Sequence, residues 1–127
     1  RLNEDYLAKK AEYDVMADML MDKYPDIDGI FAVDMVAIAC IRQLLKRKKK
    51  VPRDVKVVAY DGTYVAKVGV MNLTVVQQPI EELAKSAVNI LLNMMQGKKY
   101  HNKKAFFEPS RLYGDTTYNK DKIEFEN

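Results

Sequence analysis

Polar side chains follow three predicted strands of this sequence. They are Asp34, Asp61 and the pair Gln77–Gln78. The carboxyl ends of parallel strands meet at one edge of an open α/β sheet, which is where such folds bind their ligands. Carboxylate and amide groups accept and donate the hydrogen bonds that the hydroxyl groups of a polyol require. We therefore expect a polar ligand such as a sugar at this edge.

Three tyrosines are candidates for stacking on the apolar face of a sugar ring: Tyr6, Tyr60 and Tyr64. A structural alternative exists for the aspartates, because Asp at a strand end often caps the helix or turn that follows. The residue types alone leave both interpretations open.

Enzymatic chemistry has little support. His101, the sole histidine, lies in a lysine-rich connector, away from the predicted strand ends. The five glycines form neither a phosphate-binding loop nor a dinucleotide fingerprint. A receiver-type phosphoacceptor site needs clustered aspartates and a positioned lysine, whereas Asp34 and Asp61 are a pair on separate strands. We expect no catalytic residue, no metal site and no cofactor.

Composition is that of one soluble globular domain. The chain has 127 residues, 48% hydrophobic and 31% charged, with a net charge of +3. No apolar run reaches the roughly 18 residues of a membrane span, and no signal segment opens the chain, so a cytoplasmic protein is expected. Cys40 has no disulfide partner and is expected in the core. The basic run Lys46–Lys50 is interpreted as solvated, with phosphate binding as the alternative.

Helices and strands are expected to alternate along the chain. The predicted helices are 4–23, 35–49 and 79–95, the last capped by Gly97, and the predicted strands are 29–33, 55–60, 73–77 and two short ones at 105–107 and 111–113. This order predicts an α/β fold with three layers, a mostly parallel sheet with flanking helices.

The helix expected at 35–49 carries two apolar faces. One face contains Ala37, Cys40, Ile41 and Leu44, and the other contains Ile38 and Leu45. One face can pack on the sheet of the same domain. The second face needs a partner, which is either more of the same domain or another subunit.

Several motifs together resemble the effector domain of LacI/GalR transcriptional repressors. The matching segments are 31–39, 51–55, 58–63, 73–80 and the closing segment 109–117. The order and the spacing of these segments agree with the family over about residues 4 to 117. Val33 and Gly114 depart from it, standing where the family has Asn or Ser and Arg, respectively.

The resemblance implies a periplasmic-binding-protein-like fold of type I, with two α/β subdomains and a sugar effector between them. Residues 1–117 would be the C-terminal part of the effector-binding and dimerisation domain, and 118–127 a charged tail. Because the chain opens on Arg1 and within that subdomain, we expect it to be part of a longer protein. The family's helix-turn-helix, which binds operator DNA, would lie outside this chain. The helix after Pro79 would cross to the other subdomain.

The resemblance also implies roles for individual residues. Asp61 matches the acceptor of sugar hydroxyls, Gln78 a polar residue lining the cleft, Tyr6 the stacking aromatic, and Asp34 an acidic residue at the strand end. The helix starting at Met35 and the loop 63–69 contribute to the family's dimer interface. The interface residues expected here are Ile38, Ile41, Leu45, Tyr64 and Val68.

The sequence thus predicts the part of a LacI-type repressor that senses a sugar or sugar phosphate and forms a homodimer. One alternative is the sugar-binding protein of a transporter, which shares the fold. Another is a flavodoxin-like enzyme or receiver domain, which the isolated histidine and the separated aspartates disfavour.

Overall fold

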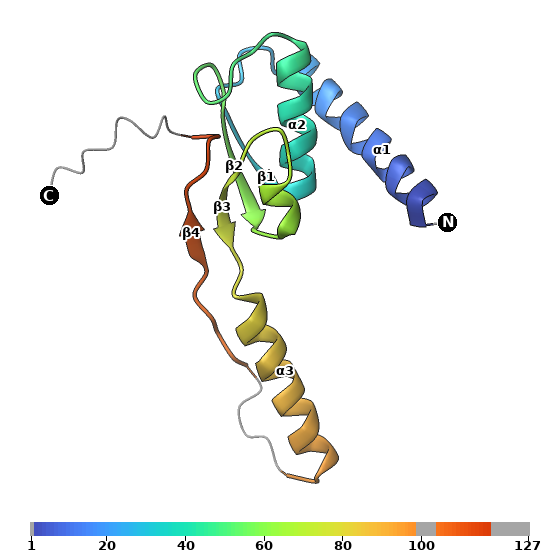
Figure 1. The fold of residues 1–127 in the computed structure, drawn as a ribbon, viewed down its shortest axis with the longest axis vertical. Helices are drawn as coiled ribbons and strands as arrows, with labels where there is room; N and C mark the ends of the chain where they lie inside the picture. The colour runs from blue at the N-terminus through green and yellow to red at the C-terminus, as the bar shows by residue number, and fades with distance from the viewer. Residues whose placement is uncertain (1, 99–103, 118–127) are drawn as a thin grey trace, which may run out of the picture.

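The computed structural model of this chain describes residues 2–98 and 104–117. Its elements, in chain order, are α1 (Leu2–Lys23), β1 (Gly29–Val33), α2 (Asp34–Lys46), β2 (Lys56–Asp61), the 3-10 turn η1 (Tyr64–Lys67), β3 (Thr74–Gln77), α3 (Ile80–Met95) and β4 (Ser110–Leu112). They form a mixed α/β fold (Figure 1). Within these residues no helix is long and apolar enough to cross a membrane.

The four strands form one sheet in the order β1-β2-β3-β4. The first three are parallel, with Phe31 opposite Val58 and Asp61 opposite Gln77, and β4 runs antiparallel to β3. Helix α2 connects β1 to β2 as a crossover, as parallel neighbours require. The predicted α/β fold with a mostly parallel sheet is confirmed.

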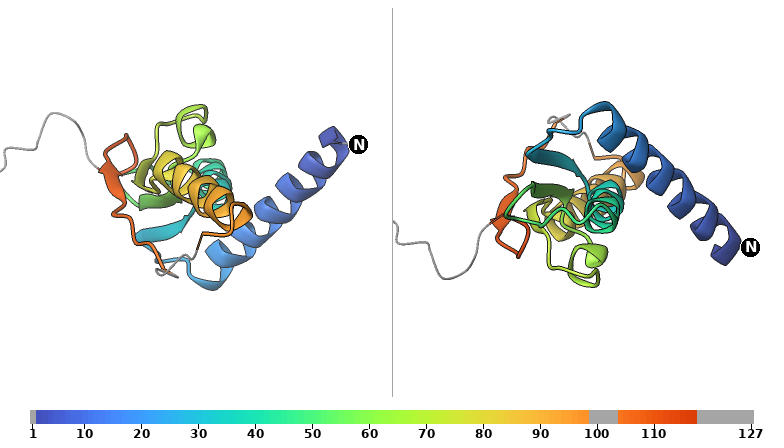
Figure 2. Two further views of the ribbon diagram at one scale, coloured as in Figure 1. Left: turned by 90° about the horizontal axis from the view of Figure 1, so that it is seen from below. Right: turned by 90° about the horizontal axis from the view of Figure 1, so that it is seen from above.

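The core lies between one face of the sheet and the helices α1 and α2, which sit on the same side of the strands in both views of Figure 2. Alternate strand residues point to this face because the side-chain period of a strand is two. The sheet contributes Ile30, Val57, Ala59 and Val75, and the helices contribute Ala17, Met21, Ala37, Cys40, Ile41 and Leu44.

The opposite face of the sheet is apolar and exposed. Phe31, Val33 and Tyr60 are each more than a third exposed there, and the rings of Phe31 and Tyr60 meet edge to face at 6.2 Å. Among the described residues, only one face therefore carries packed helices. The second helical layer of the predicted three-layer arrangement is not found in this part of the chain.

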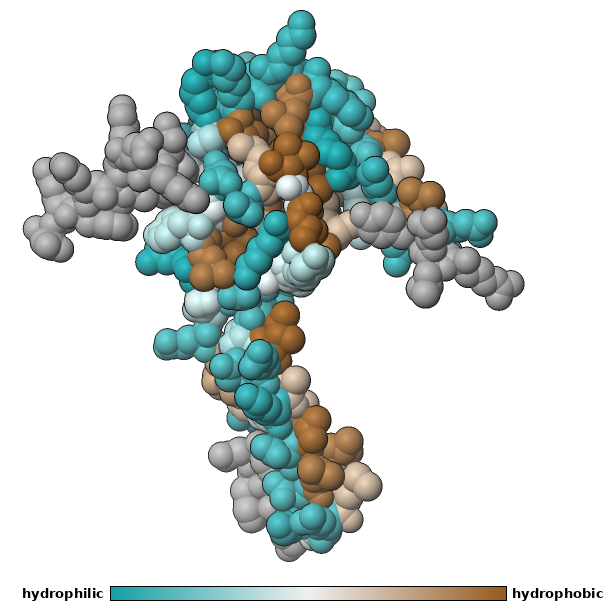
Figure 3. All heavy atoms as spheres, in the orientation of Figure 1, coloured by the Kyte–Doolittle hydropathy of each residue, from teal (hydrophilic) through white to brown (hydrophobic). Residues whose placement is uncertain are grey.

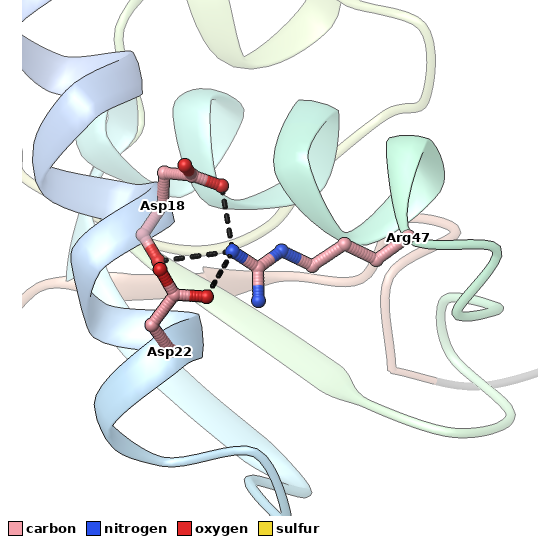
Figure 4. A network of polar contacts seen from close by, with 3 residues as sticks. All are labelled: Asp18, Asp22 and Arg47. Atoms are coloured by element: carbon pink, nitrogen blue, oxygen red, sulfur yellow. Dashed lines mark hydrogen bonds and ion pairs between the residues drawn. The ribbon is translucent and has the colours of Figure 1, made fainter.

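Charged side chains join α1 to α2 above the core. Asp14 accepts from Nε and Nη2 of Arg42 at 3.0 and 2.7 Å. Nearer the end of α2, Nη2 of Arg47 lies 2.7 Å from Asp18 Oδ1 and 2.6 Å from Asp22 Oδ1 (Figure 4). Because Arg42 lies in α2, Arg47 caps its C-terminal end and all three aspartates belong to α1, the ion pairs fix how the two helices lie against each other.

Helix α3 extends away from the sheet and buries none of its side chains among the described residues (Figure 1). Its apolar side chains gather along one side, as the brown spheres of the lower part of Figure 3 show. The stripe includes Leu83, Val88, Leu91 and Met95, all more than a third exposed. Gly97 follows the helix with φ 69° and donates its N–H to the Met94 carbonyl, which confirms the predicted cap.

Two predicted elements need correction. Helix α2 ends at Lys46 instead of 49, because Arg47 caps it and Lys48 adopts a left-handed φ of 60°. Residues 105–107 form no strand, and β4 alone, at Ser110–Leu112, pairs with the sheet. The predictions for His101 and for the tail 118–127 fall outside the described residues.

Threonine hydroxyls hold the segment after β4 against β2 and the start of β3. Thr116 Oγ1 donates to the Val57 carbonyl at 2.5 Å and accepts from the Thr74 N–H at 2.9 Å. Thr117 and Thr74 share a further hydroxyl contact at 2.8 Å. Since Thr116 is fully buried, these bonds satisfy polar groups that would otherwise be costly to bury. The closing segment is therefore an integral part of the core.

Candidate functional site

Asp61 and Gln78 lie together at the carboxyl edge of the sheet. Gln78 Nε2 donates to Asp61 Oδ1 at 2.5 Å, and the Gln78 N–H donates to the Asp61 carbonyl at 3.0 Å. Both residues are partly exposed. The parallel pairing of Asp61 with Gln77 places the two strand ends side by side. The amide of Gln78 therefore orients the carboxylate of a partly exposed aspartate.

The backbone at this edge adopts an unusual conformation. Asp61 has φ 113° and Gly62 has φ 68°, so two consecutive residues lie in the left-handed region. A Cβ on Gly62 would meet the Gln77 side chain at 2.7 Å, so only glycine fits there. For a residue other than glycine, such as Asp61, this backbone conformation costs on the order of 1–3 kcal/mol. Strained residues of this kind are concentrated at functional sites.

Asp34 occupies a different position from the one expected of a sugar-binding residue. It is 2% exposed and points inward from the first turn of α2. Its carboxylate accepts from the Gly62 N–H at 3.3 Å and from the N–H and Oγ1 of Thr63 at 2.6 and 2.7 Å. In this structure the buried oxygens of Asp34 hold the turn after β2, while its expected contact with a ligand stays a prediction.

A cleft of about 460 Å³ opens where the chain leaves β3 for α3 and returns toward β4. Its walls are formed by Gln77, Gln78, Pro79, Ile80, Glu81, Glu82, Glu108 and Ser110. The sequence predicts Gln78 at the cleft but not its acidic lining, because Glu81 and Glu82 lie in the first turn of α3, where acidic residues are common for the stability of the helix alone. Glu108 could have been found from its place next to Pro109 at the start of the closing segment.

The three candidate tyrosines are spread over the molecule. Tyr60 is partly exposed beside Phe31 on the open face of the sheet. Tyr64 is exposed at the start of η1. Tyr6 belongs to α1, but its side chain lies outside what the structure describes.

A second groove, of about 260 Å³, lies between α1, α2 and the loop around η1. It is lined by Lys10, Met35, Ile38, Arg42, Val65, Val68, Gly69 and Val70. Two of the residues expected at a subunit interface, Ile38 and Val68, thus share one surface, and exposed Tyr64 belongs to the adjoining η1. Leu45 is exposed further along α2. Ile41, in contrast, is 4% exposed and packs in the core, so this structure leaves it little surface for a partner.

The side chains at this edge are hydrogen-bonding groups. The described residues contain no group of three or more His, Cys, Asp or Glu that could hold a metal ion. Cys40 is completely buried, and burial raises the pKa of its thiol, which disfavours the nucleophilic thiolate. Asp61 and Gln78 instead offer fixed oxygen and amide groups for hydroxyls.

Comparison with known proteins agrees with this geometry. The family model described as periplasmic binding protein-like domain matches residues 2–117. The chain belongs to this family. In sequence it is 35% identical, over 98 residues, to the HTH-type transcriptional regulator CelR of Thermobifida fusca, and 34% identical, over 80 residues, to the ribose operon repressor of Halalkalibacterium halodurans. The expected resemblance to LacI-type regulators is confirmed.

Solved structures support the periplasmic-binding-protein-like fold. A complex of the transcriptional regulator CelR with cellobiose superposes with a TM-score of 0.77 at 27% identity, covering 84% of this chain and 33% of that one. The sequence matches above cover 76% and 62% of this chain but only 27% and 24% of the two regulators. This periplasmic-binding-protein-like chain thus spans about a quarter of the length of these curated relatives.

Proposed function

We propose that this chain is the effector-sensing and dimer-forming part of a LacI-type transcriptional repressor that responds to a sugar or sugar phosphate. The observation that carries the proposal is the Asp61–Gln78 pair at the carboxyl edge of the sheet, beside the cleft that leads into α3. The family membership and the names of the relatives, a ribose operon repressor among them, support the choice of a sugar.

In this proposal residues 1–117 form one lobe of the effector-binding domain, and 118–127 are a charged tail. The apolar stripe of α3 packs against the second lobe, which the relatives' greater length leaves room for. Asp61 accepts sugar hydroxyls, Gln78 orients it and lines the cleft, and Tyr6 stacks on the sugar ring. A sugar bridging the two lobes then stabilises one closure state and biases the shape of a dimer.

The repressor is cytoplasmic and binds operator DNA through a helix-turn-helix outside this chain. It needs no cofactor and catalyses no reaction. The groove of Ile38 and Val68, together with Tyr64 and Leu45, is the surface that contacts the second subunit. Lobe closure changes how the two subunits are oriented and thereby the affinity for the operator.

Replacing Asp61 with Asn tests the sugar site. The substitution keeps the size of the side chain and removes the charge that accepts hydroxyl hydrogens, so the affinity for the sugar falls about tenfold to a hundredfold. A thermal-shift screen with cellobiose, ribose, lactose and their phosphates first selects the sugar. Calorimetric titration with that sugar then measures the affinity of the wild-type protein and of the variant.

Asp26→Asn is the matched control for that titration, because Asp26 is exposed before β1, at the far end of the strands. It should bind the sugar like the wild-type protein. Unchanged sugar affinity in Asp61→Asn would remove Asp61 from the site. Sugar binding without any sugar effect on operator affinity would favour the transporter-type alternative.

A further inference from the structure

Asp34 lies where three functional elements meet. It is the first residue of α2, whose residue Ile38 lines the proposed interface groove. Its carboxylate binds Gly62 and Thr63, which follow the proposed sugar acceptor Asp61 directly. Thr63 in turn caps η1, the turn that leads into Val68 of the same groove. The buried Asp34 side chain therefore connects the proposed sugar site at Asp61 with α2 and η1, the two elements that form the proposed dimer groove.

The turn that Asp34 holds cannot be maintained by backbone preference. Asp61 and Gly62 are both left-handed, and few hydrogen bonds keep them so. On one side, Gln77 Nε2 donates to the Gly62 carbonyl at 3.1 Å, and Gln78 holds the Asp61 carboxylate. On the other side, Asp34 accepts three hydrogen bonds from Gly62 and Thr63. Without Asp34, the turn is anchored to β3 alone and loses its link to α2.

We propose that Asp34 is a positioning residue that couples the sugar-binding carboxylate of Asp61 to the dimer groove. The inference rests on the proposed function and deepens it, because it names the side chain through which one site reaches the other. A shift of Asp61 on sugar binding moves Gly62 and Thr63. Through the hydrogen bonds of Asp34 this movement displaces the start of α2, and through Thr63 it displaces the start of η1. Asp34 contacts neither the sugar nor the partner subunit.

Asp34→Asn tests the coupling with little change in shape. An amide nitrogen in place of one carboxylate oxygen faces an N–H donor, so at least one of the three hydrogen bonds is lost. We expect the sugar dissociation constant and the dimer dissociation constant to rise together, each about tenfold. Calorimetric titration with the sugar selected by thermal shift gives the first, and sedimentation velocity over a concentration series gives the second.

Comparison variants separate coupling from plain destabilisation. Asp61→Asn should weaken sugar binding and leave the dimer dissociation constant, measured without sugar, at its wild-type value. Ile38→Asp should raise the dimer dissociation constant directly, and any change in its sugar affinity reports the linkage between the two sites. Val57→Ala makes a core cavity away from the turn and should lower the melting temperature without changing either constant. The proposal is overturned if Asp34→Asn leaves both constants at wild-type values, or if Val57→Ala changes both as Asp34→Asn does.

Thr63 provides a second route in case Asp34→Asn does not fold. Thr63→Ala removes the Oγ1 donor and keeps the backbone N–H, so both constants should rise in the same direction but by a smaller factor. Thr63→Ser restores the donor and should restore both constants. Alanine and serine variants with equal constants would overturn the coupling. A wild-type protein that binds no sugar and sediments as a monomer would contradict the proposed function itself, and with it this inference.

Discussion

Two aspartates at neighbouring strand ends have opposite environments in this molecule. Asp61 is partly exposed, and its carboxylate accepts one hydrogen bond from Gln78. Asp34 is buried and accepts three hydrogen bonds from the turn after β2. A buried carboxylate is tolerated only when donors satisfy it. The role of each residue follows from the direction in which its side chain leaves the strand end.

Cys40 shows the same dependence on environment. It is fully buried in α2, and burial raises the pKa of its thiol, so little thiolate is present near neutral pH. At pH 8 we expect iodoacetamide to alkylate the native protein roughly a hundredfold or more slowly than the urea-unfolded protein. Mass spectrometry of timed samples measures both rates. Comparable rates would mean that Cys40 is accessible in the native protein.

The two crossing ion-pair sites between α1 and α2 act at the scale of whole elements. Arg42 and Asp14 are each about a quarter exposed, while Asp18 and Asp22, the partners of Arg47, are more than half exposed. Solvent and salt screen the second site more strongly. The Arg42 pair is thus the main electrostatic link between the helices.

Removing that link should lower stability more than removing its neighbour. Arg42→Met keeps the aliphatic part of the side chain and should cost up to about 1 kcal/mol, measured by urea unfolding. Arg47→Met is the matched comparison and should cost less. The loss in Arg42→Met should shrink in 1 M salt. A larger loss at Arg47, or a loss at Arg42 that salt does not change, would contradict this ranking.

Most elements were predictable because each has a strong local pattern. The strand 29–33 and the helix ending at Met95 agree with the structure, since a short apolar run and a glycine cap are local signals. The end of α2 was not predictable from charge alone, because the left-handed Lys48 decides it. The inward direction of Asp34 depends on a turn 28 residues further along the chain, and no local pattern encodes such a contact.

At the scale of the whole molecule, the described chain leaves much apolar surface uncovered. Helix α3 buries none of its side chains among the described residues, and the outer face of the sheet shows Phe31 and Tyr60. Such extended apolar patches mark surfaces that meet other protein. In the proposed function, the second lobe covers the apolar stripe of α3, and the second subunit covers the groove of Ile38 and Val68.

The subunit contact is directly testable. Ile38→Asp places a charge in the groove lined also by Val68, and burying that charge against a partner is costly, so the dimer should dissociate. Sedimentation velocity should find a monomer at concentrations where the wild-type protein is a dimer. Leu7→Asp is the control, because Leu7 is exposed on α1 and does not line the groove. If Ile38→Asp sediments as a dimer, the interface lies elsewhere.

The left-handed backbone of Asp61 also has a consequence for evolution. Glycine is the residue that this conformation accepts without cost, so selection for folding alone favours glycine at position 61. Under the proposed function, selection for ligand response favours a carboxylate at the same position. Selection for stability and selection for ligand response therefore favour different residues at position 61. A lineage that no longer needs the ligand would therefore lose Asp61 early and gain stability as it does so.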